Sequence, residues 1–170
     1  MRPLTVVGGI VVETQRFINV PMRMSERYLA RERRELWLRE ADDQEHKWIV
    51  HTRALPARRG HRVELLLKRD WVVGLFNVST GADVNYPRAD PPFLLWGVDL
   101  LVVLTLAIGL PAWLGALGFV LAALSAMSYL AFAACARAVR RWRLRRQVDA
   151  ALAEIRSAAA LEPVRRAARR

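Results

Sequence analysis

Two patterns of hydrophobic and polar positions divide the chain. In the first half, apolar and polar residues alternate with the period of two that is typical of half-buried β-strands. From position 93 to position 136, by contrast, 44 residues contain a single formal charge, that of Asp99. A membrane-spanning helix needs roughly 20 apolar residues, so this run is long enough for two spans. The pattern predicts an α+β membrane protein, in which a β-domain precedes a two-helix transmembrane hairpin.

The alternating region predicts five short strands, mostly antiparallel. The segments ADDQE and KRD between them have the composition of hairpin turns. Five such strands favour a small closed or half-open β-barrel, OB-like or SH3-like, that fills residues 1–91. Its residues 15–33 form an insertion, expected as a short helix or a flap, and residues 1–90 are expected to fold alone. The predicted strands cover residues 4–14, 35–40, 46–52, 61–68 and 71–77.

The apolar run predicts two spans within residues 92–137, joined by a tight turn. Gly109 and Pro111 disfavour helix, so the first span is expected at residues 92–110 and the second at residues 115–137. The linking sequence GLPAWLGALG has no charge, which suits the far side of the membrane. Trp96 and Trp113 fall near the two ends of the first span, where indole rings favour the headgroup region.

Charge predicts the orientation of this hairpin. The net charge is +11, and its excess is concentrated just after the second span. By the positive-inside rule this flank is cytoplasmic, and two spans return both termini to the cytoplasmic side. The same cations suit anionic lipid headgroups. The six arginines are Arg137, Arg140, Arg141, Arg143, Arg145 and Arg146.

The C-terminal segment predicts a basic amphipathic helix over residues 138–162, continuous with the second span. Its apolar positions recur at helical spacing and form one stripe. That stripe needs a partner, which is the β-domain, a second copy or the bilayer surface. Residues 163–170 are short and basic, and we expect them to be disordered. The stripe consists of Leu144, Val148, Ala151, Leu152 and Ile155.

Asp99 lies about seven residues into the first span, which places it in the cytoplasmic third of the membrane. We expect it to form an ion pair with Arg137 or Arg140 of the returning helix. An ion pathway and a contact with an outside partner are the alternatives.

Small residues recur every four positions in the second span, at Gly118, Ala122 and Ala126. Such a stripe lets two helices approach closely. The partner is the first helix of the same hairpin or a helix of another subunit. A two-helix protein buries few membrane faces by itself, so a homo-oligomer or a larger membrane complex is expected.

The sequence contains no recognisable catalytic constellation. Ser79 and Thr80 have no nucleophile elbow around them, and the single cysteine, Cys135, provides neither a disulfide framework nor a redox pair. His46 and His51 are five apart on one predicted strand and therefore point to opposite faces; His61 has no paired carboxylate or cysteine to complete a metal site. We expect no enzymatic activity, no cofactor and no metal.

A nucleic-acid-binding barrel is a weaker hypothesis. Small barrels bind single strands through aromatic side chains beside basic ones, yet a domain of this size needs its aromatics in the core. Residues 1–92 have only four more cations than anions. The candidates are Trp37, Trp48, Trp71 and Phe76, with Arg34, Arg39, Lys47 and Arg62.

The segments ELWLREADDQEHKWIV, LPARRGHRVELLL and GLFNVSTG resemble a group of uncharacterised bacterial inner-membrane proteins. In those proteins, a small β-domain with a Gly-His-Arg turn and an Asn-x-x-Thr-Gly segment precedes membrane helices. The resemblance covers residues 35–81 and implies a bacterial inner-membrane location but no activity.

These features together predict a non-enzymatic accessory, scaffold or regulatory subunit that presents a small interaction domain at the membrane. A homo-oligomeric channel or transporter component is the first alternative. Few polar residues line the spans, which disfavours it. A membrane-tethered nucleic-acid-binding barrel is the second alternative.

Overall fold

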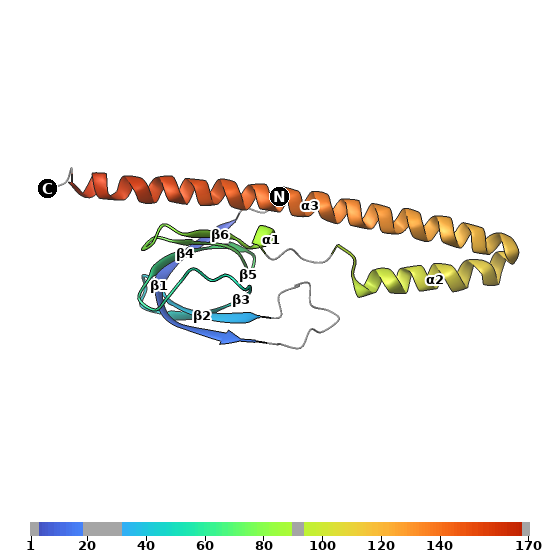
Figure 1. Cartoon of the computed structure of the whole chain (residues 1–170), viewed down its shortest axis with the longest axis horizontal. Coiled ribbons are helices and arrows are strands. Elements are labelled where there is room, and N and C mark those ends of the chain that lie inside the picture. The colour runs from blue at the N-terminus through green and yellow to red at the C-terminus, as the bar shows by residue number, and fades with distance from the viewer. Residues whose placement is uncertain (1–3, 19–31, 90–93, 168–170) are drawn as a thin grey trace. The chain divides into compact units, whose positions relative to one another are not determined.

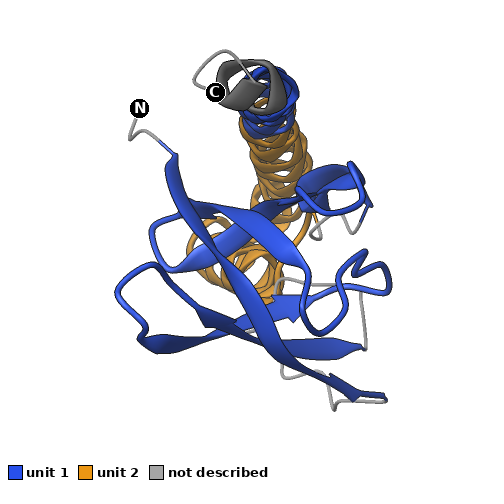
Figure 2. Cartoon of the chain, turned by 90° about the vertical axis from the view of Figure 1, so that its left-hand side faces the viewer, with its two compact units in different colours: residues 1–21, 28–91, 143–170 blue, residues 22–27, 92–142 orange. Residues whose placement is uncertain are grey.

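The computed structural model describes residues 4–18, 32–89 and 94–167, with side chains as far as Leu161 (Figure 1). The chain forms two compact units (Figure 2). We call one the sheet unit, which contains the six strands, helix α1 and helix α3 from Arg143 onward. The other is the hairpin unit, which contains helix α2 and helix α3 as far as Trp142. The elements are β1 (Thr5–Phe17), β2 (Arg33–Arg39), β3 (Glu45–His51), β4 (Arg62–Lys68), β5 (Trp71–Asn77), β6 (Asp83–Asn85), α1 (Tyr86–Ala89), α2 (Gly97–Leu114) and α3 (Ala116–Ala167).

The six strands form one antiparallel sheet in the order β3-β2-β1-β4-β5-β6. Strand β1 is central: its first half pairs with β4 and its second half with β2. A register shift between Val11 and Glu13 separates the two halves, and such a bulge bends and twists a strand. Among the described strands, β3 and β6 do not pair with each other, so the sheet is open.

The predicted five-stranded barrel is therefore not confirmed. Alternation shows which side of a strand is buried, but it does not show whether the outer strands meet. Strand β6 has only three residues, which is too short for a periodic signal. Strand β1 also continues to Phe17, so part of the predicted insertion is strand. Residues 19–31 of that insertion lie outside the described residues.

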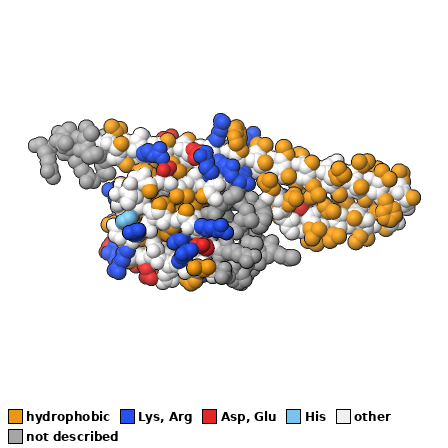
Figure 3. Space-filling view, in the orientation of Figure 1, with side chains coloured by type: hydrophobic (Ala, Val, Ile, Leu, Met, Phe, Trp, Pro, Cys, Tyr) orange, Lys and Arg blue, Asp and Glu red, His pale blue; other side chains and the backbone are white. Residues whose placement is uncertain are grey.

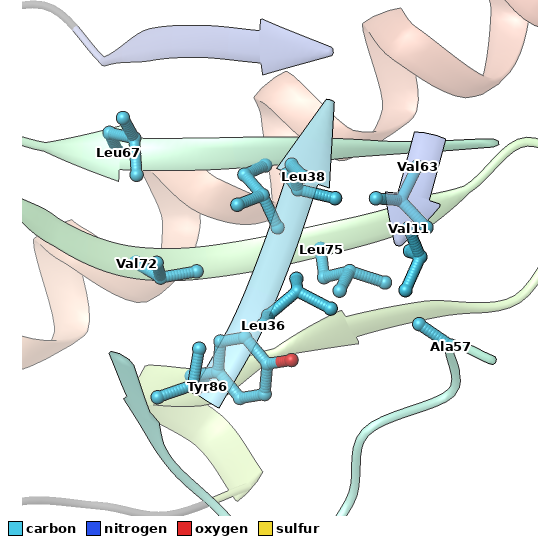
Figure 4. Close-up of a cluster of buried hydrophobic side chains, with 11 residues drawn as sticks. Val11, Leu36, Leu38, Ala57, Val63, Leu67, Val72, Leu75 and Tyr86 are labelled. Atoms are coloured by element: carbon cyan, nitrogen blue, oxygen red, sulfur yellow. The ribbon is translucent and has the colours of Figure 1, made fainter. Parts of the chain in front are cut away.

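One face of the sheet encloses the main hydrophobic core (Figure 4). Strands β4 and β5 are buried on both faces, because alternate residues enter this core while Leu66, Val73 and Phe76 enter a second cluster. The main core consists of Val11, Leu36, Leu38, Val50, Ala57, Val63, Leu65, Leu67, Val72, Leu75 and Tyr86.

Helix α3 supplies the other side of the second cluster. Val148 and Leu152 are almost wholly buried against β4 and β5. Gly74 permits this close packing, since a Cβ atom there would lie 3.0 Å from Cγ1 of Val148. The sheet is thus the partner of the apolar stripe that the sequence left open. Leu144, Ala151, Ile155 and Ala159 pack at its margin.

Polar contacts fix the same segment of α3 to the last strand and helix α1. Asp149 accepts a hydrogen bond from Asn85 at 2.8 Å and forms an ion pair with Arg88 at 2.7 Å. Arg145 donates to the carbonyl oxygen of Pro87 at 2.9 Å. Each of these bonds joins residues about 60 positions apart in the chain.

The hairpin unit differs from the prediction at its turn. Helix α2 continues through Pro111 to Leu114, although a proline inside a helix removes one intrahelical hydrogen bond and crowds the preceding turn. Gly115 alone separates the two helices. Its φ of 58° is a conformation that glycine adopts without steric cost. Both helices are long and apolar enough to cross a membrane, and few of their residues are buried.

Helix α3 also differs at its other end. The backbone is helical past Pro163 to Ala167, whereas the sequence predicted disorder over residues 163–170; residues 168–170 lie outside the described residues. Alanine and arginine are strong helix formers, and they surround this proline in the sequence.

Candidate functional site in the hairpin unit

The one carboxylate of the apolar run is enclosed by protein groups. Asp99 lies in the first turn of α2, and its side chain is 2 % exposed. Its Oδ2 accepts a hydrogen bond from the backbone N–H of Trp96 at 2.6 Å. A carboxylate in this position satisfies an N–H group that the helix leaves without a partner, and it interacts favourably with the helix dipole. Helix α2 thus orients Asp99 by its own backbone.

Arg137 of α3 meets this carboxylate with both terminal nitrogens. Nη2 donates to Oδ1 of Asp99 at 2.8 Å, and Nη1 donates to Oδ2. Nη1 also donates to the carbonyl oxygen of Leu94 at 2.8 Å, and the guanidinium lies 4.3 Å from the centre of the Trp96 ring. Two parallel charge-assisted bonds and a stacked ring hold the arginine in one orientation.

Tyr129 adds a third partner that the sequence interpretation missed. Its hydroxyl group donates to Oδ1 of Asp99 at 2.8 Å. Tyr129 precedes Arg137 by eight residues, and this spacing puts both side chains on one face of a helix. That spacing was the available signal. We call Asp99, Trp96, Tyr129 and Arg137 the Asp99 cluster.

The buried negative charge of Asp99 is fully compensated by hydrogen-bond donors. A buried carboxylate without partners is costly, but here an arginine, a phenol and a backbone N–H all donate to it. Among the described residues of the two apolar helical stretches, no second carboxylate lies near it that could continue a proton path. The arrangement can clamp the start of α2 to the middle of α3, at the end of the hairpin unit farthest from Gly115.

The structure divides the six predicted arginines by their surroundings. Arg137 pairs with Asp99, whereas Arg140 is exposed. Arg145 donates to the carbonyl oxygen of Pro87, and Arg141 is partly buried. Arg143 and Arg146 are exposed.

Gly118, the first residue of the small-residue stripe, packs directly against α2. A Cβ atom on Gly118 would lie 2.3 Å from the carbonyl oxygen of Leu110, so any larger residue would push the helices apart. Ala122 is buried and Ala126 is partly buried. Gly118, Ala122 and the Asp99-binding residues of α3 recur at helical spacing. The stripe therefore packs inside the hairpin, which is the first of the two partners considered from sequence.

The aromatic side chains of the sheet unit do not form a common surface. Phe76 is buried beneath α3, and Trp48 packs against the main core. Trp71 is half-exposed after the β4–β5 turn, and Trp37 lies on β2 with Lys47 5.6 Å above its ring. These positions do not provide the row of stacked aromatics that single-stranded nucleic acid uses.

Carboxylates alternate with cations on β2 and β3. Arg39 forms an ion pair with Glu45 at 2.8 Å, which raises the pKa of the Arg39 guanidinium above its ordinary value. Glu35 lies between Arg33, at 3.0 Å, and Lys47, at 3.5 Å. Neighbouring pairs of opposite sign leave little net positive field for a phosphate backbone. The Arg34 guanidinium donates to the carbonyl oxygen of Arg53, and the backbone N–H of Arg62 donates to the hydroxyl group of Ser79.

The Gly-His-Arg and Asn-x-x-Thr-Gly segments meet at one buried side chain. Oδ1 of Asn77 accepts hydrogen bonds from the backbone N–H groups of Ser79 and Thr80. Its Nδ2 therefore donates to the carbonyl oxygen of Pro56 at 2.6 Å and to Nδ1 of His61 at 2.8 Å. Nδ1 of His61 is the acceptor in this contact. The hydrogen bonds of Asn77 thus hold the loop that precedes β4 against the turn that follows β5.

The histidines do not assemble into a metal site. His46 contacts Glu40 at 3.1 Å, and His61 belongs to the Asn77 connection. In the part of the chain that the structure describes, no three histidine, cysteine or carboxylate side chains come together. Comparisons of the chain with known protein families, curated proteins and solved structures gave no match.

Proposed function

We propose that this protein is a non-enzymatic component of the bacterial inner membrane, in which the hairpin unit spans the bilayer and holds the sheet unit at the cytoplasmic surface. In this role it serves as an accessory, scaffold or regulatory subunit of a membrane complex. The sheet unit provides the surface for interaction.

The observation that supports this proposal most is the composition of the second hydrophobic cluster. It joins Leu66 and Phe76, which precede the apolar run, to Val148 and Leu152, which follow it. Segments that pack in one core must lie on the same side of a membrane. An even number of spans between them meets this requirement, and the two apolar helices supply that number. This argument is independent of charge.

The outer surface of the hairpin unit also suits a lipid environment. Large apolar side chains such as Phe119, Met127 and Phe132 are exposed there. In Figure 3, hydrophobic side chains cover most of the hairpin surface that faces the viewer. A soluble protein rarely exposes so large an apolar area. By the positive-inside rule, the arginines that follow the apolar stretch of α3 favour a cytoplasmic location for both termini.

The same features weigh against the two alternatives. A channel needs polar groups free to face a path, but Asp99 has four hydrogen bonds and Thr105 donates to Leu101 of its own helix. A nucleic-acid binder needs a continuous basic and aromatic face, but Glu35 and Glu45 interrupt the β2–β3 surface.

Cysteine labelling in cells tests the topology. In a Cys135→Ser background, single cysteines replace the exposed residues Arg58 and Ala150, which flank the apolar run in sequence. A membrane-impermeant maleimide should label both positions in inside-out vesicles and neither in intact spheroplasts. Labelling of the two positions from opposite sides would contradict two spans, and labelling of both in spheroplasts would contradict the cytoplasmic location.

The subunit role has a separate test. The full chain, extracted from its host in mild detergent, should migrate as a complex with a second protein in a fixed ratio. Quantitative mass spectrometry of the purified complex measures that ratio. A chain that behaves as a lone monomer, with no protein in constant proportion, would contradict the role.

A further inference from the structure

We propose that Arg140 and Arg143 bind the phosphate groups of anionic phospholipids, and this inference rests on the proposed membrane location. The arginines that follow the apolar stretch of α3 are not equivalent. Arg137 and Arg145 donate to Asp99 and to the carbonyl oxygen of Pro87, so protein acceptors occupy them. Arg140 and Arg143 are exposed, and within the described residues neither meets an acceptor.

Their spacing suits a shared ligand. Residues three apart on a helix are neighbours on its surface, so the two guanidinium groups can reach the same headgroup or two adjacent ones. Trp142 lies between them in sequence and is 52 % exposed. Indole rings favour the depth at which lipid phosphates lie. A guanidinium group can also donate two parallel hydrogen bonds to one phosphate.

The position along α3 supports the same ligand. The apolar stretch of this helix is followed directly in sequence by the cationic segment. Helix α3 is continuous through this region, so the arginines are held on a regular backbone. Anionic lipid attracts each arginine near the surface with about 1 kcal/mol, which is roughly a fivefold preference.

Lipid exchange in nanodiscs tests the proposal with the full chain. Discs contain phosphatidylethanolamine with one tenth phosphatidylglycerol, and native mass spectrometry counts the lipids that stay bound. Wild-type protein should retain phosphatidylglycerol in excess of its share. The Arg140→Gln/Arg143→Gln variant should lower that enrichment roughly fivefold per arginine. The control, Arg58→Gln/Arg59→Gln, removes the same charge from an exposed loop and should retain the wild-type enrichment.

The outcomes separate this inference from the proposed function. Equal enrichment in both double variants, or no enrichment in the wild type, would overturn the lipid site while the protein remains in the disc. Failure of the wild type to enter discs at all would instead contradict the membrane location. Circular dichroism of each variant shows whether the helices are intact, and a variant that keeps its helices but loses the enrichment supports the site.

Discussion

Helix α3 consists of two segments with opposite surfaces. As far as Trp142 it exposes large apolar side chains and keeps small residues, such as Gly118 and Ala122, on the side of α2. From Arg143 onward it buries Val148 and Leu152 and exposes arginine and alanine. The first segment thus exposes its large apolar side chains, whereas the second segment buries them.

The difference shows which force holds each segment. In water, burial of apolar area against the sheet supplies the stabilisation. In the proposed membrane location, that force is absent between the two helices of the hairpin, because lipid is as apolar as their side chains. Close backbone contact at Gly118 and the bonds of the Asp99 cluster then have to hold the hairpin together. Substitutions in the two segments test this distinction, and a substitution on the β2–β3 surface provides a comparison where neither force acts.

The largest effect is expected where α3 packs in the sheet unit. Val148→Asp places a charge in a site that is wholly buried, and it should destabilise the sheet unit by about 3–5 kcal/mol. The matched control is Ala150→Asp, since Ala150 is exposed on the same helix. Thermal unfolding of the full chain in detergent, followed by Trp fluorescence, measures both. Equal melting temperatures for the two variants would show that α3 does not complete this core.

A smaller effect is expected in the Asp99 cluster. Arg137→Gln leaves the buried carboxylate of Asp99 without its cation, and the melting temperature of the hairpin unit should fall by roughly 10 °C. Asp99→Asn should cost less, and the double variant should be more stable than Arg137→Gln, because it no longer contains an unpaired buried carboxylate. Additive losses in this double-mutant cycle would contradict direct coupling. Arg140→Gln, at an exposed position, serves as the control.

Two glycine substitutions should distinguish the effect of close helix packing from the effect of helix propensity on the stability of the hairpin. Gly118→Ala brings a Cβ atom against the backbone of Leu110 and should destabilise the hairpin by about 1–3 kcal/mol. Gly109→Ala meets open space and should stabilise helix α2 by up to about 1 kcal/mol. Protease resistance in detergent provides the measurement. If both substitutions act alike, the close approach is not what holds the helices.

The smallest effect is expected on the β2–β3 surface. Arg39→Ala removes an exposed ion pair with Glu45, and such pairs contribute little. The melting temperature of the sheet unit should change by less than about 2 °C. A larger fall would mean that this surface stabilises the sheet and is not merely solvated.

Local pattern predicted much of the fold. The limits of β2 to β5 fall within two residues of those expected from alternation, and a helical hairpin follows from the length of the apolar run. The pairing of Asp99 with Arg137 could be expected from equal depth on two returning helices. These features depend on neighbouring residues or on simple chain geometry.

Features that depend on distant contacts were not predictable in the same way. An open sheet and a closed barrel have the same alternation, so the absent β3–β6 pairing left no sequence signal. The packing of α3 against the sheet, by contrast, did leave a signal in the sequence. The runs LLL in β4 and VVGLF in β5 are continuously apolar, which indicates strands covered on both faces. The expectation that residues 1–90 fold alone is untested, but the buried area around Val148 predicts that they need α3.

The second hydrophobic cluster also sets an order for biosynthesis. Its sheet half is translated before the apolar helices and its helical half after them. Leu66, Val73 and Phe76 therefore remain uncovered on the nascent chain until Val148 and Leu152 have left the ribosome. Exposed apolar strand surface of this kind favours aggregation. In the proposed membrane location, delivery of the hairpin to the bilayer during translation would bring the two halves together soon after synthesis, so that targeting and folding would be coupled.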